Sequence, residues 1–278
     1  MFVSTDTNYS MRLSQGQLNL LERCPRLFQH TYLDQLGSPT SPEQQERLAW
    51  GSRFHLLMQQ RELGVPIESL VQEDAQMQCW MSAFASAAPE ILANGLERQT
   101  FRESEHCRTL QVRDYLLTVV YDLLIADEFQ AQILDWKTYP KPQNRSRLEH
   151  NWQSLLYLYV LAETSDYLPA QISMTYWFVQ SPKQPQSVKF AYNTTQHQQT
   201  GQKLHQMLSQ LSDWLQRYQA GEPFPQVYEG SDRCSFCQYA VRCERDPSSK
   251  KFGDSDNQEL ESGRDWLPNL ANIQEVSL

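Results

Sequence analysis

The spacing of four cysteines constrains the fold of this chain more than any other feature of its sequence. Cys234, Cys237 and Cys243 fall within the short run Cys-Ser-Phe-Cys-Gln-Tyr-Ala-Val-Arg-Cys, and Cys24 lies near the other end of the 278 residues. Clustered thiols are typical ligands of zinc and of iron–sulfur clusters. If all four bind one metal centre, the N-terminal and C-terminal segments must lie side by side in the fold.

The composition is that of a globular protein, with 40% hydrophobic and 21% charged residues. No apolar run approaches the length of a membrane span, and the first residues lack the features of a secretory signal. We therefore expect a cytoplasmic protein whose thiols stay reduced, which favours metal ligation over disulfides. We interpret the two remaining cysteines, Cys79 and Cys107, as small buried hydrophobic residues.

The charge is uneven along the chain. The formal net charge is −9, and residues 246–278 are strongly acidic, so we expect them to form a flexible tail. Lysine and arginine gather in residues 137–150. The net charge argues against tight nonspecific DNA binding, but it leaves room for a local groove that binds an anion. The sequence contains no phosphate loop, so we do not expect a nucleotide-driven motor.

Hydrophobic periodicity and turn residues predict a mixed α/β fold. We expect one or two helices over residues 14–28, broken near Pro25, and helices over 48–63, 67–87, 146–163 and 195–219. We expect strands over 100–106, 110–125 with a turn at Arg113-Asp114, 131–138, 172–179 and 187–192, and loops over 34–47 and around Pro140 and Pro142.

Asp135 and Lys137 are the first candidate catalytic pair. On a strand, residues two apart face the same side, so both project together. A carboxylate and an amine at a strand end can hold a hard cation and orient a water, although an Asp-x-Lys alone also fits an ordinary surface ion pair. Asp122 lies in an apolar run, where a carboxylate is costly unless it binds a metal or pairs with a cation such as Arg113.

Three further residues complete the set. His55 lies in a predicted helix, where a histidine is more often structural than a ligand. Gln153 and Tyr157 are four residues apart and therefore share a helical face, which an amphipathic seam would also explain.

The order of these residues resembles the RecB-like branch of the PD-(D/E)XK nuclease superfamily over about residues 10–245. The matching positions are Gly51 with His55, Asp122, Asp135 with Lys137, and Gln153 with Tyr157. The four cysteines resemble those of an iron–sulfur subgroup that includes the AddB nuclease domain and CRISPR spacer-acquisition nucleases. Val119 stands where the family has a glycine.

The resemblance implies a restriction-endonuclease-like fold, with a mixed central sheet flanked by helices and the terminal segments joined at the cluster. It implies a single nuclease domain over 10–245, with a helical insertion at about 48–95. His55, Asp122, Asp135 and the Trp136 carbonyl would bind Mg²⁺ or Mn²⁺. Lys137 would activate water, with Asp122 and Asp135 as the other catalytic residues, and Gln153 and Tyr157 would contact the active site or DNA.

The same resemblance implies a [4Fe–4S] cluster on Cys24, Cys234, Cys237 and Cys243, with zinc as the alternative. The implied function is a metal-dependent DNA exonuclease with single-strand preference, in DNA repair or CRISPR adaptation. Its partners would be DNA and a helicase or CRISPR adaptation proteins. The alternative is a catalytically weak DNA-binding or scaffolding subunit of a helicase–nuclease complex.

Overall fold

The structure is a computed structural model that describes residues 11–37, 41–72, 74–88, 91, 100–139, 144–180 and 185–245. The chain divides into two compact units. The first comprises Met1–Gln15 and Ser41–Lys203, and the second comprises Gly16–Thr40 and Leu204–Leu278. The predicted acidic tail, 246–278, and the predicted loop at Pro140 and Pro142 lie outside the described residues.

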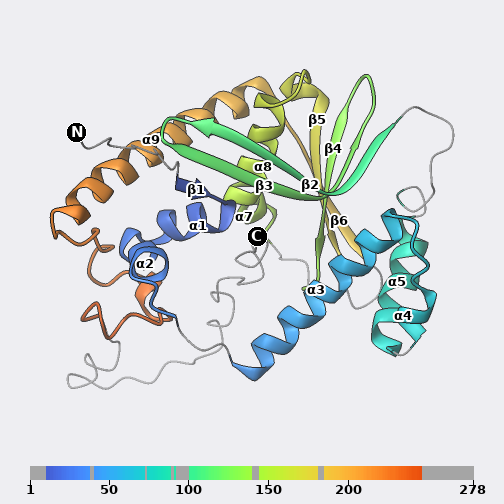
Figure 1. The fold of residues 1–278 in the computed structure, drawn as a ribbon, viewed down its shortest axis with the longest axis horizontal. Helices are drawn as coiled ribbons and strands as arrows, with labels where there is room; N and C mark the ends of the chain where they lie inside the picture. The colour runs from blue at the N-terminus through green and yellow to red at the C-terminus, as the bar shows by residue number, and fades with distance from the viewer. Residues whose placement is uncertain are drawn as a thin grey trace, which may run out of the picture. The chain divides into compact units, whose positions relative to one another are not determined.

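The first unit is built on a mixed sheet of six described strands (Figure 1). The strands are β1 (Met11–Leu13), β2 (Phe101–Val112), β3 (Tyr115–Ala126), β4 (Ala131–Lys137), β5 (Ile172–Phe178) and β6 (Gln186–Ala191). The order β1-β3-β4-β5-β6 forms the main path, and β2 pairs with the other edge of β3. Pairing is antiparallel for β2–β3, β3–β4 and β5–β6 and parallel for β1–β3 and β4–β5.

Two strands, β1 and β4, pair with the same edge of β3. Its first residues pair with β1, and its last residues, from Leu123 to Ala126, pair with β4. The stretch of this edge between the two ladders has no ladder partner among the described strands. Polar groups on such a stretch must find other hydrogen-bond partners, and this stretch contains Asp122.

Three helices pack beside β3, β4 and β5 in the same unit. They are α3 (Pro42–Glu62), α4 (Glu68–Gln72) and α5 (Ala75–Ala87). Ser41 caps α3 and Pro42 occupies its first turn, so the helix starts earlier than the apolar pattern predicts. Their apolar faces join the strands in one core cluster that includes Phe54, Phe84 and Trp136.

A second helical layer of this unit consists of α7 (Arg145–Glu149) and α8 (Trp152–Glu163). The expected continuous helix over 146–163 is broken, because Asn151 caps the second segment through the amide of Gln153. Helix α8 contacts β2, β3 and β5, and nine of its twelve residues are buried. A helix buried on most of its surface shows no amphipathic stripe, so its sequence alone does not reveal which face meets the sheet.

The second unit holds α1 (Gln15–Arg23), α2 (Pro25–Phe28), a π-helical turn (Gln29–Leu33) and a 3₁₀ turn (Asp232–Cys234). The boundary between the units falls within α9 (Thr194–Gln219). Within this unit, the C-terminal segment contacts the end of α1, because the Arg233 side chain donates to the carbonyls of Arg23 and Glu22.

The mixed sheet flanked by helices is confirmed, and several local predictions are wrong. The expected turn at Arg113-Asp114 is confirmed, but the expected interruption between residues 106 and 110 is wrong, because β2 runs unbroken from Phe101 to Val112 and pairs with β3. Part of the expected loop at 34–47 belongs to α3, and Asp74 caps α5 within the expected 67–87 helix. Cys79 and Cys107 are exposed, so neither is a buried core residue. No described helix has the length and apolarity that crossing a membrane requires.

Candidate functional site

A local break in the sheet positions Asp122. Strand β2 pairs with the residues on either side of Asp122, but the register passes over Asp122 itself and over Glu105 opposite it. On the other edge the ladder with β4 ends at Leu123–Leu134. Regular pairing between β3 and both of its neighbours, β2 and β4, is therefore interrupted at Asp122. The Asp122 side chain can accept hydrogen bonds that a backbone carbonyl accepts in a regular ladder.

The Asp122 carboxylate replaces the missing backbone acceptor. The Trp136 amide donates to Asp122 Oδ2 at 2.6 Å, within an Asp122 side chain that is only 3% exposed. Helix α3 brings His55 to the same point, with Nδ1 3.4 Å from Asp122 Oδ1 and Nε2 3.1 Å from the Trp136 carbonyl. The predicted residues His55, Asp122 and Trp136 are therefore brought together. Arg113 lies at the tip of the hairpin and is not what balances the Asp122 charge.

Glu105 is a member of this site that the sequence analysis missed. Ligand atoms of His55, Glu105 and Asp122 all lie within 4.8 Å of one another, the one such group among the described residues. Glu105 has a φ of 52°, which is uncommon outside glycine and occurs at the skipped pair with Asp122. Two carboxylates and an imidazole are a donor set that suits a divalent cation. The antiparallel register places Glu105 opposite Asp122, and that register was the signal that could have identified it.

Asp135 and Lys137 form the neighbouring half of the site. Lys137 Nζ lies 2.6 Å from Asp135 Oδ1, and Gln153 of α8 donates to Asp135 Oδ2 at 2.6 Å. Asp135 is 0% exposed and Lys137 4%. Trp136 stands between them in the chain and bonds Asp122 and His55 through its backbone, so the two halves are joined by one residue of β4. Asp135 is not part of the compact group with His55.

Tyrosine and serine side chains support Gln153. Tyr176 of β5 lies 3.5 Å from Gln153 Oε1 through its hydroxyl, which also contacts Ser154 Oγ at 2.8 Å. The Lys137 amine lies 5.3 Å from the centre of the Tyr176 ring. Burial, and then the nearby Asp135 charge, raise the pKa of Tyr176 well above its ordinary value, so this hydroxyl stays protonated as a donor.

Tyr157, expected to contact the active site or DNA, is fully buried. Its ring packs edge-on against Tyr121 at 5.2 Å, and its carbonyl accepts from the Tyr121 hydroxyl at 3.0 Å. Gln153 is also buried and bonds Asp135. Because Gln153 is buried, contact with the active site is favoured over contact with DNA for this residue. The burial of Tyr157 favours a packing role.

Gly51 of α3 lies against the end of β4. A Cβ atom at this position would lie 3.0 Å from Thr138 Oγ1, a separation that real Cβ atoms rarely show. The glycine therefore lets α3 come close to the strand end that carries Asp135 and Lys137. His55 lies one turn further along the same helix, which gives a steric reason for the spacing between the glycine and the histidine.

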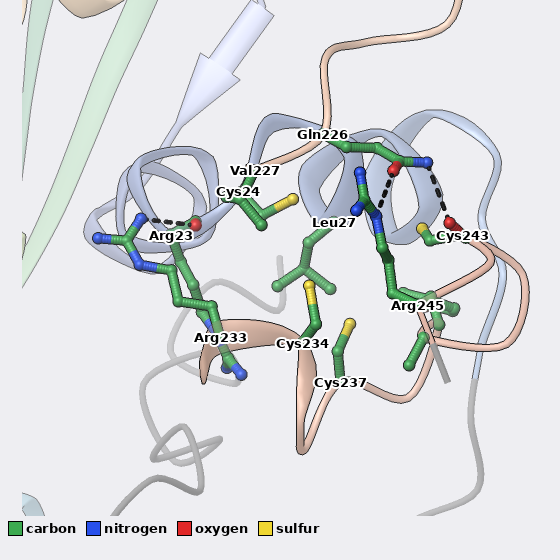
Figure 2. Close-up of a pocket in the computed structure, with 12 residues that line it drawn as sticks. Arg23, Cys24, Leu27, Gln226, Val227, Arg233, Cys234, Cys237, Cys243 and Arg245 are labelled. Atoms are coloured by element: carbon green, nitrogen blue, oxygen red, sulfur yellow. Dashed lines mark hydrogen bonds between the residues drawn. The ribbon is translucent and has the colours of Figure 1, made fainter. Parts of the chain in front are cut away.

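The four clustered cysteines line one pocket of the second unit, of about 400 Å³ with its open solvent included (Figure 2). The segments that carry Cys24 and the other three are therefore brought together. The sulfur atoms do not form a group as compact as the one at His55, since no other set among the described residues meets the same 4.8 Å limit. Gln226 lies at the rim, bonding the Cys243 carbonyl and Arg245.

Three arginines, Arg23, Arg233 and Arg245, share the wall of this pocket. Burial raises the pKa of the Cys237 thiol, and a backbone hydrogen bond at Tyr239 and then the charge of Arg23 partly offset that effect. Burial likewise raises the pKa of Cys243, partly offset by Arg26. The pocket therefore combines thiols with positive charges that would stabilise them once they lose their protons.

Comparison with known proteins identifies the family. A sequence model of the PD-(D/E)XK nuclease superfamily matches residues 12–244. Among solved structures, a candidate exonuclease from Eubacterium rectale is similar at a TM-score of 0.48 and 12% identity, over 84% of this chain and 92% of that one. The protein SSO0001 is similar at a TM-score of 0.37 and 13% identity, over 86% of this chain and 87% of that one. A search of curated proteins found no match. Because the family match spans most of the sequence and contains all of the site residues described above, the chain belongs to the PD-(D/E)XK nuclease superfamily.

Proposed function

We propose that this chain is a metal-dependent DNA exonuclease that hydrolyses phosphodiester bonds and prefers single strands. The observation that carries the proposal is the compact group of His55, Glu105 and Asp122, joined through the Trp136 backbone to the buried pair of Asp135 and Lys137. A cation site beside a lysine is the arrangement that metal-assisted hydrolysis of a phosphodiester requires.

The residues fit a divalent ion, Mg²⁺ or Mn²⁺, held by His55, Glu105 and Asp122. Bound there, the ion supplies Lewis-acid stabilisation of the phosphate and lowers the pKa of a water. Asp122 is held in place by the Trp136 amide, and His55 by the Trp136 carbonyl. Asp135 is oriented by Gln153 and holds the Lys137 amine, whose positive charge favours the build-up of negative charge on the substrate. Asp135 therefore acts in the proposal mainly through Lys137.

We also propose that Cys24, Cys234, Cys237 and Cys243 bind a [4Fe–4S] cluster. Four thiols and three arginines in one pocket suit an anionic cluster. Thiolates that share one zinc ion lie about 3.8 Å apart, given a Zn–S bond of about 2.3 Å. On a [4Fe–4S] cluster each thiolate binds a different iron and the sulfurs are further apart, so a [4Fe–4S] site does not require three thiols within the 4.8 Å limit, which the described cysteines do not meet. Zinc remains the alternative.

The pathway stays a prediction: DNA repair or CRISPR adaptation, in the cytoplasm, with a helicase or CRISPR adaptation proteins as partners. A valine in place of the family's glycine at position 119 would favour the scaffolding alternative if it disturbed the site, and Val119 is 1% exposed within β3. That residue does not enter the contacts of Asp122 given above, and this favours the enzyme over the scaffold.

The test of the nuclease proposal uses the full chain with Mn²⁺ and end-labelled single-stranded and double-stranded DNA. We expect cleavage that depends on the metal and progresses from ends. Lys137→Met alone would leave the Asp135 charge buried without its cation, which costs stability. The double variant Asp135→Asn with Lys137→Met removes both charges. We expect it to stay folded, to keep Mn²⁺ binding at His55 and to lose cleavage. Undiminished cleavage by this variant would overturn the assignment.

The test of the cluster proposal is made on protein purified without oxygen. We expect a brown protein with iron and sulfide in a ratio of about one to one. Replacing any one of the four cysteines by serine should lower the iron content, whereas Cys79→Ser, at an exposed cysteine, should not. A colourless protein with one zinc per chain would establish the alternative.

A further inference from the structure

His30 lies between one of the four cysteines and a carboxylate in the second unit. Its Nε2 is 3.7 Å from Cys243 Sγ, and its Nδ1 is 2.8 Å from Asp34 Oδ2. His30 is buried, with 4% of the residue exposed. It lies on the π-helical turn Gln29–Leu33, a backbone form that is frequent at functional sites. The imidazole therefore connects the Cys243 sulfur with Asp34 over a sequence distance of more than 200 residues.

Asp34 is held by more than the histidine. The Tyr218 hydroxyl donates to its Oδ1 at 2.6 Å, and the Gln29 amide donates to its Oδ2 at 3.1 Å. Burial raises the pKa of Asp34, but the hydrogen bonds from Tyr218, His30 and Gln29 outweigh it and leave the pKa below its ordinary value. The group facing His30 Nδ1 is therefore a carboxylate at neutral pH.

An aromatic ring packs against the imidazole. The Tyr239 ring lies edge-on to it, with the ring centres 5.1 Å apart. The neighbouring Gln29 anchors the turn that carries His30, because its Oε1 accepts from the Phe224 amide at 2.7 Å. The ring contact and the Asp34 hydrogen bond together favour the orientation in which Nε2 faces Cys243.

We propose that His30 is a positioning residue for the four-cysteine site, and that it holds the Cys243 sulfur in place by a hydrogen bond from its ring. This inference rests on the proposed metal centre. A metal-bound cysteine carries no proton, so in the loaded site the bond runs from His30 Nε2–H to Cys243 Sγ. Asp34 orients the ring by accepting from Nδ1–H, as second partners of metal-site histidines do. In the proposed loaded site the imidazole thus donates from both nitrogens, which only the doubly protonated ring can do, and it lies between two negatively charged partners. Hydrogen bonds to the sulfurs of iron–sulfur clusters help set their reduction potential.

Two measurable consequences follow from this bond. It favours the reduced cluster, which carries more negative charge, so its loss should shift the reduction potential to a more negative value. It also restrains one of the four ligands, so its loss should speed the release of iron. A typical hydrogen bond changes an equilibrium about fivefold, and we expect iron release to a chelator to be about fivefold faster without it.

The experiment compares the full chain with three single variants, all purified without oxygen. His30→Leu removes the donor, His30→Gln retains an N–H that can reach sulfur, and Asp34→Asn removes the carboxylate that orients the ring. The measurements are iron content, the rate of iron release to a chelator, and the reduction potential. The matched control is His205→Leu, at an exposed histidine of the same unit.

We expect His30→Leu to release iron about fivefold faster and to have a more negative potential, with Asp34→Asn intermediate and His30→Gln close to the original chain. The unfolding temperature of the loaded protein separates this effect from a general loss of structure. If His30→Leu matches the original chain in release rate and potential, the inference is overturned. It is also overturned if the original chain binds no iron. DNA cleavage at the His55 site is measured separately, so failure of the nuclease proposal is distinguishable.

Discussion

The backbone amide of Trp136 donates to the carboxylate of Asp122 at 2.6 Å, at the point where the β3–β4 ladder has ended. One side chain thus replaces the backbone acceptor that a regular sheet would provide. The same carboxylate faces His55 and Glu105. Asp122 therefore has two functions that substitutions can separate, because one needs only an acceptor oxygen and the other needs a negative charge.

Asp122→Asn should keep the first function and lose the second. The asparagine Oδ1 can still accept from Trp136, so we expect little change in stability, whereas Asp122→Ala leaves the amide without an acceptor and should cost about 1–3 kcal/mol. Both variants should lose metal binding and DNA cleavage. Urea unfolding and Mn²⁺ titration measure the two effects, with Glu128→Gln, at an exposed acid of the β3–β4 turn, as the control. Cleavage by Asp122→Asn at the original rate would show that the charge is not needed.

Glu105→Gln should weaken Mn²⁺ binding by about tenfold or more, because it removes one of two carboxylates from a three-residue group. The matched control is Glu103→Gln, two residues earlier on β2 and outside that group. Calorimetric titration of Mn²⁺ measures the affinity of both variants without relying on cleavage. Equal affinities would mean that Glu105 is not a ligand.

Gly51→Ala should impair cleavage although alanine favours a helix by about 1 kcal/mol over glycine. The new Cβ would lie 3.0 Å from Thr138 Oγ1, so the Thr138 side chain, α3 or the end of β4 must shift by a few tenths of an ångström. Because α3 and β4 carry site residues, we expect the cleavage rate to fall while the free energy of unfolding changes little. Adding Thr138→Ala removes the opposing oxygen and should restore cleavage. A double variant as slow as Gly51→Ala would exclude this contact as the cause.

Asp34→Asn should change how stability depends on pH. The folded state lowers the pKa of Asp34 below its unfolded value of about 3.9, so the carboxylate stabilises the fold above that pH. This contribution is lost as the pH falls through the lower, folded-state pKa. Urea unfolding at about pH 6 and about pH 3 measures the free energy of unfolding of both proteins. We expect the variant to be less stable than the original chain at the higher pH, and the difference to be smaller at the lower pH. A stability difference that does not change with pH would contradict this.

The sequence by itself was sufficient for the order of most helices and strands, although several of their bounds were wrong. The short apolar run before Pro140 predicts β4, because a strand needs only a few consecutive residues that favour extended backbone. The order of His55, Asp122, Asp135 and Lys137 predicts the superfamily, which the family match confirms. The spacing of the cysteines predicts that the two terminal segments meet, and the shared pocket contains all four.

Only the tertiary structure decided how these residues are grouped. Glu105 lies opposite Asp122 because β2 pairs with β3, and His55 joins them because α3, distant in the sequence, packs at the same point. Asp135 separates from that group because Gln153 of α8 and Lys137 hold it. His30 meets Cys243 for the same reason, since packing brings together residues that the chain keeps far apart. Local periodicity specifies elements, whereas the chemistry of both sites depends on long-range contacts.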